Sequence, residues 1–234
     1  MSKSDPSPNT PDNVPPDLAA RIHRGVVAVL LLVMTVETLV ALYNQQWLTA
    51  FLVLAIMAVI IAPGALGRRF QVHIPAEFQL LAVVFVFAAL FLGEIRRYYE
   101  RIWWWDIALH VSSGLLLGIL GFLLVYVLNE SKRVDLHMRP RFVALFAFSF
   151  ALAAGVLWEI FEFAMDQLAG TNMQKPMFGD PSGLTDTMWD LIVDSLGALI
   201  ISLLGWWYME RGQRSFIETW IRKFIERNPH LFRG

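Results

Sequence analysis

The chain has 234 residues, of which 56% are hydrophobic, and it carries a formal net charge of -1 and no cysteine. Its mean hydropathy of +0.52 is too high for a soluble globular domain and is typical of multi-span membrane proteins. The absence of cysteine excludes disulfides and thiolate chemistry, and the near-neutral charge gives no basic field that would attract a nucleic-acid partner.

The first 20 residues are polar and rich in proline. We predict a disordered tail over residues 1–20, because so little apolar surface cannot offset the entropy lost on ordering. The first apolar run, Gly25–Asn44, is followed by polar residues and not by a small-residue cleavage site. This pattern favours a retained membrane anchor over a cleaved signal peptide.

Six apolar runs are each long enough, at 1.5 Å per residue, to cross a hydrocarbon core of about 30 Å. Turn-forming and polar segments separate them. We therefore predict an all-α, polytopic membrane helix bundle of about six transmembrane helices, formed by residues 21–210 as one integral domain. The runs are Gly25–Asn44, Trp47–Leu66, Glu77–Ile95, Asp106–Leu128, Phe142–Phe163 and Thr187–Met209.

Lysine and arginine indicate how the bundle is oriented. If the N-terminus is cytoplasmic, 15 of the 19 Lys and Arg residues lie on the cytoplasmic side, in agreement with the positive-inside rule. We therefore expect both termini in the cytoplasm. The four outer cations are Arg96, Arg97, Arg101 and Lys175, and the three arginines are candidates for binding an anionic ligand.

Residues 211–234 contain an amphipathic pattern after the last span. We predict an amphipathic cytoplasmic helix on the membrane surface. The same stripe also fits a helix that docks on cytoplasmic loops or on a second protomer, and this alternative stays open. The apolar positions are Phe216, Ile217, Trp220, Ile221, Phe224 and Ile225.

Acidic residues stand inside or at the edge of three predicted spans, where an ionised side chain costs at least ~2.5 kcal/mol. The predicted topology places them at the outer ends of the fourth, fifth and sixth spans. The helical period puts the acidic residues of each span on one stripe, so the three stripes can face one another. They are Asp106 with His110, then Glu159, Glu162 and Asp166, then Asp186, Asp190 and Asp194.

Carboxylates and one imidazole on facing helices suit a hard or borderline divalent ion. We therefore predict a divalent metal ion in this pocket. Four of the acidic residues also fit a plainer interpretation, as interfacial groups that cap helices or pair with arginine: Asp106, Glu162, Asp166 and Asp186. The predicted metal ligands are Asp106, His110, Glu159, Glu162, Asp190 and Asp194, and the candidates for lining the pocket are Glu37, Glu94, Asp166 and Asp186.

Three functions fit such a pocket. The leading hypothesis is a metal-dependent enzyme for a lipid-linked or amphipathic substrate, in which the ion polarises a phosphate or activates water. A proton- or cation-coupled transporter uses the same residue types, although the inner halves of these spans carry few polar residues. A membrane scaffold, working as a homo-oligomer or with a membrane-protein partner, is the third. Ser112, Ser113 and Ser195 lie nearby, and serines in membrane helices more often serve packing than catalysis.

Four strings of residues resemble the YjdF-like family of bacterial inner-membrane proteins, a family of unknown function. The resemblance covers most of Arg21–Trp207 and implies a multi-pass protein of the bacterial inner membrane. More distantly, the fifth and sixth spans are similar to the VanZ-like family, whose members tend to carry Asn at the position of Asp194. The four strings are Leu92–Glu94, Trp105–Gly114, Trp158–Glu162 and Asp186–Ala198.

Overall fold

The computed structural model describes residues 18–70, 73–130, 138–211 and 216–229. The tail predicted over residues 1–20 therefore lies outside the described residues as far as residue 17, and Leu18 begins the first helix. Within the described ranges the long elements are all helices and no β-strand forms. The predicted all-α class is confirmed.

Six helical segments are long and apolar enough to cross a membrane, which confirms the predicted number of spans. The fifth extends beyond its predicted end at Phe163, because the helix continues until Gly170 adopts a left-handed conformation (φ 65°). The third changes to π-helical winding at Phe87. The spans are α1 (Leu18–Tyr43), α2 (Trp47–Phe70), α3 (Ala76–Val86) continued by η2 (Phe87–Ile95), α5 (Trp105–Glu130), α6 (Pro140–Ala169) and α7 (Leu184–Glu210).

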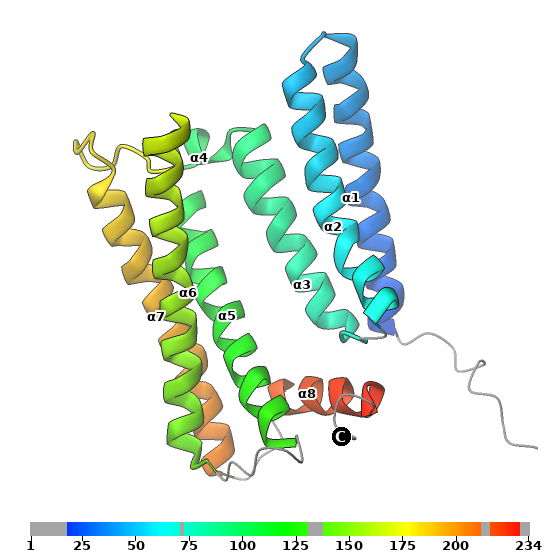
Figure 1. Cartoon of the computed structure of the whole chain (residues 1–234), viewed down its shortest axis with the longest axis vertical. Coiled ribbons are helices and arrows are strands. Elements are labelled where there is room, and N and C mark those ends of the chain that lie inside the picture. The colour runs from blue at the N-terminus through cyan, green and yellow to red at the C-terminus, as the bar shows by residue number, and fades with distance from the viewer. Residues whose placement is uncertain (1–17, 71–72, 131–137, 212–215, 230–234) are drawn as a thin grey trace, which may run out of the picture.

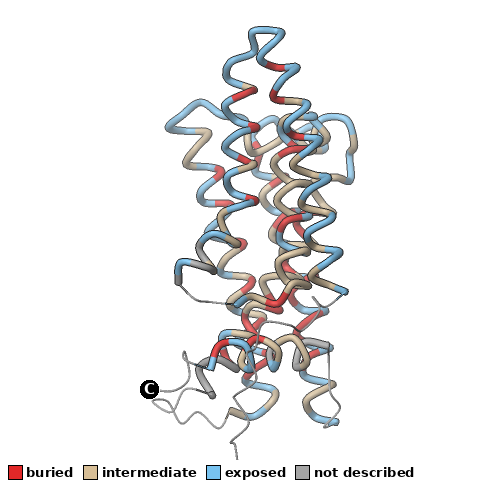
Figure 2. Tube along the Cα trace, turned by 90° about the vertical axis from the view of Figure 1, so that its right-hand side faces the viewer, coloured by how far each residue is buried: buried red, intermediate tan, exposed pale blue. Residues whose placement is uncertain are grey.

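The spans form two groups, which Figure 1 shows side by side: α1, α2 and α3 in one, and α5, α6 and α7 in the other. The short helix α4 (Tyr98–Arg101) connects them at the upper end of that view. The buried positions face the inside of the groups, while much of the outer surface is exposed (Figure 2). An exposed apolar exterior is expected of a protein whose solvent is lipid.

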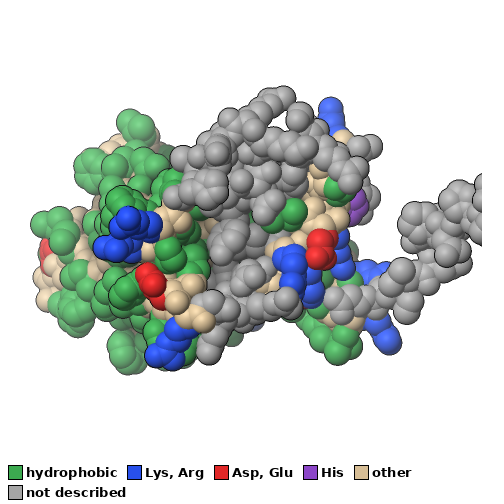
Figure 3. All heavy atoms as spheres, turned by 90° about the horizontal axis from the view of Figure 1, so that it is seen from below, with side chains coloured by type: hydrophobic (Ala, Val, Ile, Leu, Met, Phe, Trp, Pro, Cys, Tyr) green, Lys and Arg blue, Asp and Glu red, His purple; other side chains and the backbone are tan. Residues whose placement is uncertain are grey.

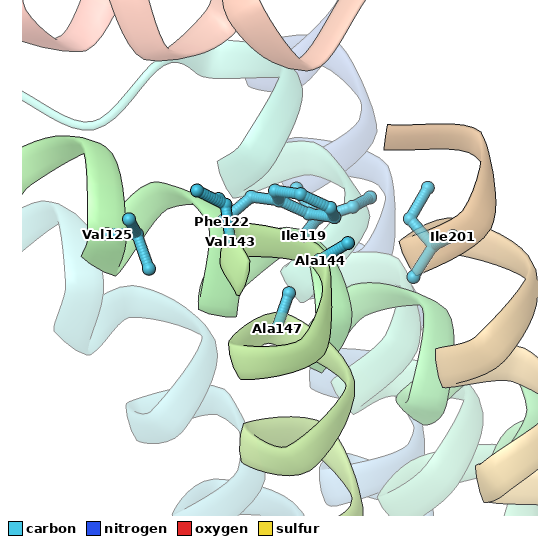
Figure 4. Packing of buried hydrophobic residues seen from close by; sticks show 7 residues of the cluster. All are labelled: Ile119, Phe122, Val125, Val143, Ala144, Ala147 and Ile201. Atoms are coloured by element: carbon cyan, nitrogen blue, oxygen red, sulfur yellow. The ribbon is translucent and has the colours of Figure 1, made fainter. Parts of the chain in front are cut away.

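Side chains from α5, α6 and α7 meet in one hydrophobic cluster (Figure 4), which lies toward the lower end of the second group in the view of Figure 1. Small residues bring α5 and α7 together above it. A Cβ on Gly114 would collide with the backbone of Asp194, and a Cβ on Gly197 would collide with the backbone of Val111. Each glycine thus faces the backbone of the other helix, the kind of close approach that small residues permit in membranes. The cluster comprises Ile119, Phe122, Val125, Val143, Ala144, Ala147 and Ile201.

Helix α8 (Phe216–Arg227) is the predicted amphipathic helix, and it lies across the lower end of the bundle (Figure 1). Trp220 packs edge-on against Phe78 with ring centroids 5.9 Å apart, and Lys223 pairs with Glu77 at 2.5 Å. The buried Asn228 side chain accepts a hydrogen bond from the backbone of His73 and donates one back to it. Helix α8 therefore packs against the start of the third span.

Candidate functional site

His110 is the centre of the acidic cluster. It lies on α5, is buried, and has carboxylates on both sides of its ring. Its Nδ1 lies 3.2 Å from an oxygen of Asp194, and its Nε2 lies 3.6 Å from an oxygen of Asp106 and 3.6 Å from an oxygen of Asp190. Asp106 stands one turn earlier on α5, while Asp190 and Asp194 are one turn apart on α7. His110 and its three carboxylate neighbours therefore come from two helices, α5 and α7.

One ligand atom each from Asp106, His110 and Asp190 can be chosen so that all three atoms lie within 4.8 Å of one another. Two carboxylate oxygens and one imidazole nitrogen at that separation can surround a single divalent ion. Asp106 is the most exposed of the three, with 20% of its side chain accessible.

Asp194 lies on the other side of the imidazole. In the neutral tautomer that carries its proton on Nδ1, His110 donates a hydrogen bond to Asp194. The lone pair on Nε2 then faces Asp106 and Asp190. Ser113 also donates a hydrogen bond to Asp194. Gly155 on α6 makes room for this carboxylate, because a Cβ there would lie 2.8 Å from its oxygen. In metal sites a carboxylate often holds a ligating histidine in this way.

Two carboxylates of the cluster are buried and poorly satisfied. Asp190 is 1% exposed and Glu159 is 4% exposed. Neither oxygen of either side chain has a hydrogen-bond partner among the described residues. By contrast, Glu162 on the same face of α6 accepts a hydrogen bond of 2.8 Å from the Trp158 indole. A buried charged group without hydrogen bonds is normally paired with an opposite charge or bound to a metal ion.

Asp166 and Asp186 organise the loop between α6 and α7. Asp166 accepts hydrogen bonds from the backbone of Met173 and Gln174. One oxygen of Asp186 accepts a hydrogen bond of 2.6 Å from the backbone N–H of Lys175, and its other oxygen has no partner in the described part of the chain. The loop is therefore tied to the end of α6 and the start of α7. Asp186 also belongs to the buried cluster on α7.

The arginines proposed for anion binding are mostly paired with other residues. Arg96 forms an ion pair of 3.1 Å with Glu37 and so ties the end of η2 to α1. Arg97 pairs with Glu100 at 2.5 Å. Arg101 is exposed on α4, and Glu94 is exposed on η2. The structure thus places Glu37 in a contact with the arginine segment, whereas the acids that contact His110 come from α5 and α7.

Tyr99 was missed by the sequence reasoning. Arg97 adopts a left-handed conformation (φ 59°), which turns the chain from η2 into α4. The ring of Tyr99 then packs where a Cβ on Gly93 would be, and the Lys175 ammonium lies 5.4 Å from the ring centroid. Burial, together with the nearby Asp106, raises the pKa of the Tyr99 phenol. A tyrosine at a membrane interface usually indicates only an aromatic belt, so the sequence carried no distinguishing signal.

Asp180 is a structural residue of the loop between α6 and α7, and its replacement gives a testable outcome. Its exposed carboxylate accepts hydrogen bonds from Ser182 and Thr185, which lower its pKa. Because the folded pKa is below the unfolded value of about 3.9, this stabilisation is present above pH 4 and is lost as pH falls through the folded pKa. We expect Asp180→Asn to speed amide exchange at Ser182 and Thr185 severalfold.

Hydrogen exchange read by mass spectrometry checks this expectation, with Asp166→Asn as the matched variant. Asp166→Asn should instead loosen Met173 and Gln174, whose N–H groups it holds. In the parent, protection of the Asp180 turn relative to intrinsic exchange should be the same at pH 7 and pH 5. A loss of protection between those two values would contradict the assignment.

The fold and the cluster together define a six-span helical membrane protein with a buried carboxylate and histidine site at one end of its second helix group. The chain belongs to the family described as "Predicted membrane protein (DUF2238)", whose model matches residues 22–211. This confirms the resemblance to the YjdF-like family, and the protein accordingly contacts membrane lipid. An uncharacterised protein of Thermotoga maritima is 33% identical over 125 residues, which cover 53% of this chain and 59% of that protein. No solved structure matches the chain.

Proposed function

We propose that this protein binds a divalent metal ion inside the membrane, with Asp106, His110 and Asp190 as ligands. The observation that carries the proposal is the Asp190 carboxylate, which is buried, faces Nε2 of His110, and has no hydrogen-bond partner within the described ranges. Leaving such a group uncompensated in a medium of low polarity costs several kcal/mol. A cation between Asp190 and the imidazole would remove that cost.

The proposed ion is suited to chemistry as well as to structure. Three protein ligands leave coordination positions open, as in catalytic metal sites, where water or substrate completes the shell. The partly exposed Asp106 marks the side from which a ligand would approach. We therefore propose a metal-dependent enzyme that acts on a lipid-linked or amphipathic substrate, with the ion polarising an oxygen or activating water.

The interior of the second helix group supports an enzyme more than a transporter. Beyond Asp194, Ser202 is the one polar side chain among the buried residues that the structure describes on α7. The hydrophobic cluster around Phe122 and Ile201 then fills the space between α5, α6 and α7 (Figure 4). A carrier needs a polar route to both sides of the membrane, and this packing favours a site that opens at one end only.

We further propose that the site faces the periplasm of a bacterial inner membrane and that both termini are cytoplasmic. The distribution of Lys and Arg along the sequence supports this orientation. Figure 3 shows the lower end of the molecule, where Lys and Arg side chains gather with few acidic ones among the described atoms. The acidic cluster lies toward the opposite end, with the loop between α6 and α7.

The test is metal binding by the purified protein in detergent, compared between the parent, His110→Gln and His23→Gln. We expect the parent to retain Mn²⁺ or Zn²⁺ after dialysis, with at least one ion per chain by elemental analysis. His110→Gln should weaken binding by at least tenfold, because it removes the imidazole ligand. His23 lies on α1, so His23→Gln should bind as the parent does. A parent that retains no ion, or a His110→Gln variant with parental affinity, would refute the proposal.

A further inference from the structure

Lys175 is a cation near the acidic cluster that pairs with no carboxylate among the described residues. It belongs to the loop between α6 and α7, which Figure 1 shows at the same end of the molecule as α4. Its ammonium donates a hydrogen bond of 2.5 Å to the carbonyl of Asn172 and lies 5.4 Å from the centroid of the Tyr99 ring. Because an ammonium has three N–H donors, this one can still donate to a bound anion.

The backbone at Lys175 is fixed to the first turn of α7. The N–H of Lys175 donates a hydrogen bond of 2.6 Å to Asp186, a buried residue that stands one turn before Asp190. The side chain of the preceding residue, Gln174, donates a hydrogen bond of 2.7 Å to the Thr187 hydroxyl. Two contacts with α7 therefore set the position from which the Lys175 side chain extends.

The ring that the ammonium faces belongs to a segment that packs on the start of α5. Tyr99 lies on α4, and its neighbour Tyr98 meets Trp105 edge-on with ring centroids 5.0 Å apart. Trp105 directly precedes Asp106 on α5. Lys175 thus reaches from α7 to the segment beside Asp106, and its charge acts on the Asp106 carboxylate. The same two helices, α5 and α7, carry the proposed metal ligands.

We propose that Lys175 binds a phosphate group of the substrate, beside the ion held by Asp106, His110 and Asp190. This inference rests on the proposed function, because carboxylates repel an anion and the ion is what allows the site to accept one. Lysine binds phosphate as a compact positive charge, and divalent ions bind the phosphate oxygens of many substrates. The proposed substrate is therefore a molecule that carries phosphate.

The experiment measures how dihexanoyl phosphatidic acid and inorganic phosphate bind to the purified full chain in a non-ionic detergent. Isothermal titration calorimetry is carried out on Mn²⁺-loaded protein and on protein in EDTA. We expect the parent to bind phosphatidic acid only in the Mn²⁺-loaded form. Lys175→Gln should weaken this binding by about tenfold or more, since hydrogen bonds to charged groups contribute about 1.5 to 3 kcal/mol, and Lys175→Arg should restore most of it.

Two further results separate a binding role from a structural one. Lys175→Gln should keep at least the parental affinity for Mn²⁺, because it removes a positive charge and no metal ligand. The matched control is Arg24→Gln on α1, where the Arg24 side chain bonds only to a backbone carbonyl of its own helix among the described residues. It removes the same charge as Lys175→Gln and should bind phosphatidic acid as the parent does.

The outcomes distinguish this inference from the proposed function. If Mn²⁺-loaded Lys175→Gln binds phosphate as the parent does, or if the loaded parent binds neither compound, the inference fails and the metal site stands. A parent that binds no Mn²⁺ would overturn both. Loss of phosphate binding in Arg101→Gln but not in Lys175→Gln would assign the phosphate to that arginine of α4 and also overturn the inference.

The two phosphate compounds identify the source of the group. Tighter binding of phosphatidic acid than of inorganic phosphate would assign the site to a lipid head group, whereas equal affinities would assign it to a free phosphate. Either result supports the role of Lys175 when Lys175→Gln weakens the binding and Lys175→Arg restores it.

Discussion

Asp190→Asn should abolish the stabilisation of the protein by divalent ions without lowering the melting temperature of the metal-free form. Asn has nearly the same shape as Asp, so the packing of α7 against α5 is kept. The substitution removes a charged carboxylate ligand of the proposed ion, and a neutral amide attracts a divalent cation less strongly than a carboxylate does. Binding to the folded state alone stabilises a protein by about 2.7 kcal/mol at a hundred times Kd, and this contribution should disappear.

Without metal, the melting temperature of Asp190→Asn should not fall below that of the parent. Asp190 is buried and its oxygens lack partners among the described residues. An unsatisfied buried polar group costs about 1 to 3 kcal/mol, and a charged one costs more. Replacing it with a neutral amide removes part of that cost, so the melting temperature without metal should stay the same or rise. A ligand role predicts this pair of results, whereas a purely structural role for Asp190 predicts destabilisation in both conditions.

Thermal unfolding in detergent, followed by tryptophan fluorescence with EDTA and with saturating Mn²⁺, measures both effects. Glu226→Gln serves as the control, because it also converts a carboxylate to an amide but lies exposed on α8. It should keep the parental shift with Mn²⁺. A shift of parental size in Asp190→Asn would show that this residue does not hold the ion.

Most of the fold was predictable because membrane spans are long, continuous apolar runs. Each of the six runs is found as a helical span, since lipid offers no alternative partner for the backbone. The π-helical winding from Phe87 and the left-handed Arg97 were not predictable. These features depend on how η2 meets α4, and the local sequence there, FLGEIRR, is compatible with an ordinary helix end.

The grouping of the acidic residues on facing helices was predictable, but the contacts of each carboxylate were not. Helical period placed the carboxylates of α5, α6 and α7 on facing stripes, and the structure does bring Asp106, Asp190 and Asp194 around His110. The helical period does not predict which ring nitrogen of His110 each carboxylate contacts, because this depends on how α7 is rotated about its axis relative to α5. For the same reason the sequence could not distinguish Asp166, which holds the loop, from the acids around the histidine.

Gly114→Val should separate α7 from α5 and so weaken both the fold and the site. A Cβ on Gly114 would lie inside the contact distance of the Asp194 backbone and 3.0 Å from the backbone nitrogen of Ala198. Backbone atoms cannot rotate away as a side chain can, so the helices must move apart. Overpacking of this kind costs about 1 to 3 kcal/mol. The movement also displaces the Asp194 carboxylate from His110, and loss of such an orienting group weakens metal binding by about 10- to 100-fold.

The matched control is Gly25→Val on α1, where a new Cβ would meet nothing within 4 Å. It should leave the melting temperature and the Mn²⁺ affinity at parental values. Gly197→Val approaches the same contact from the other helix, because its Cβ would collide with the backbone of Val111, and it should reproduce the Gly114→Val result. If both variants lose stability but bind Mn²⁺ normally, the metal ligands do not depend on the α5 and α7 contact. If neither loses stability, the two helices do not approach as closely as described. Combined loss in both variants would show that the small residues place His110 and Asp194 within reach of one another.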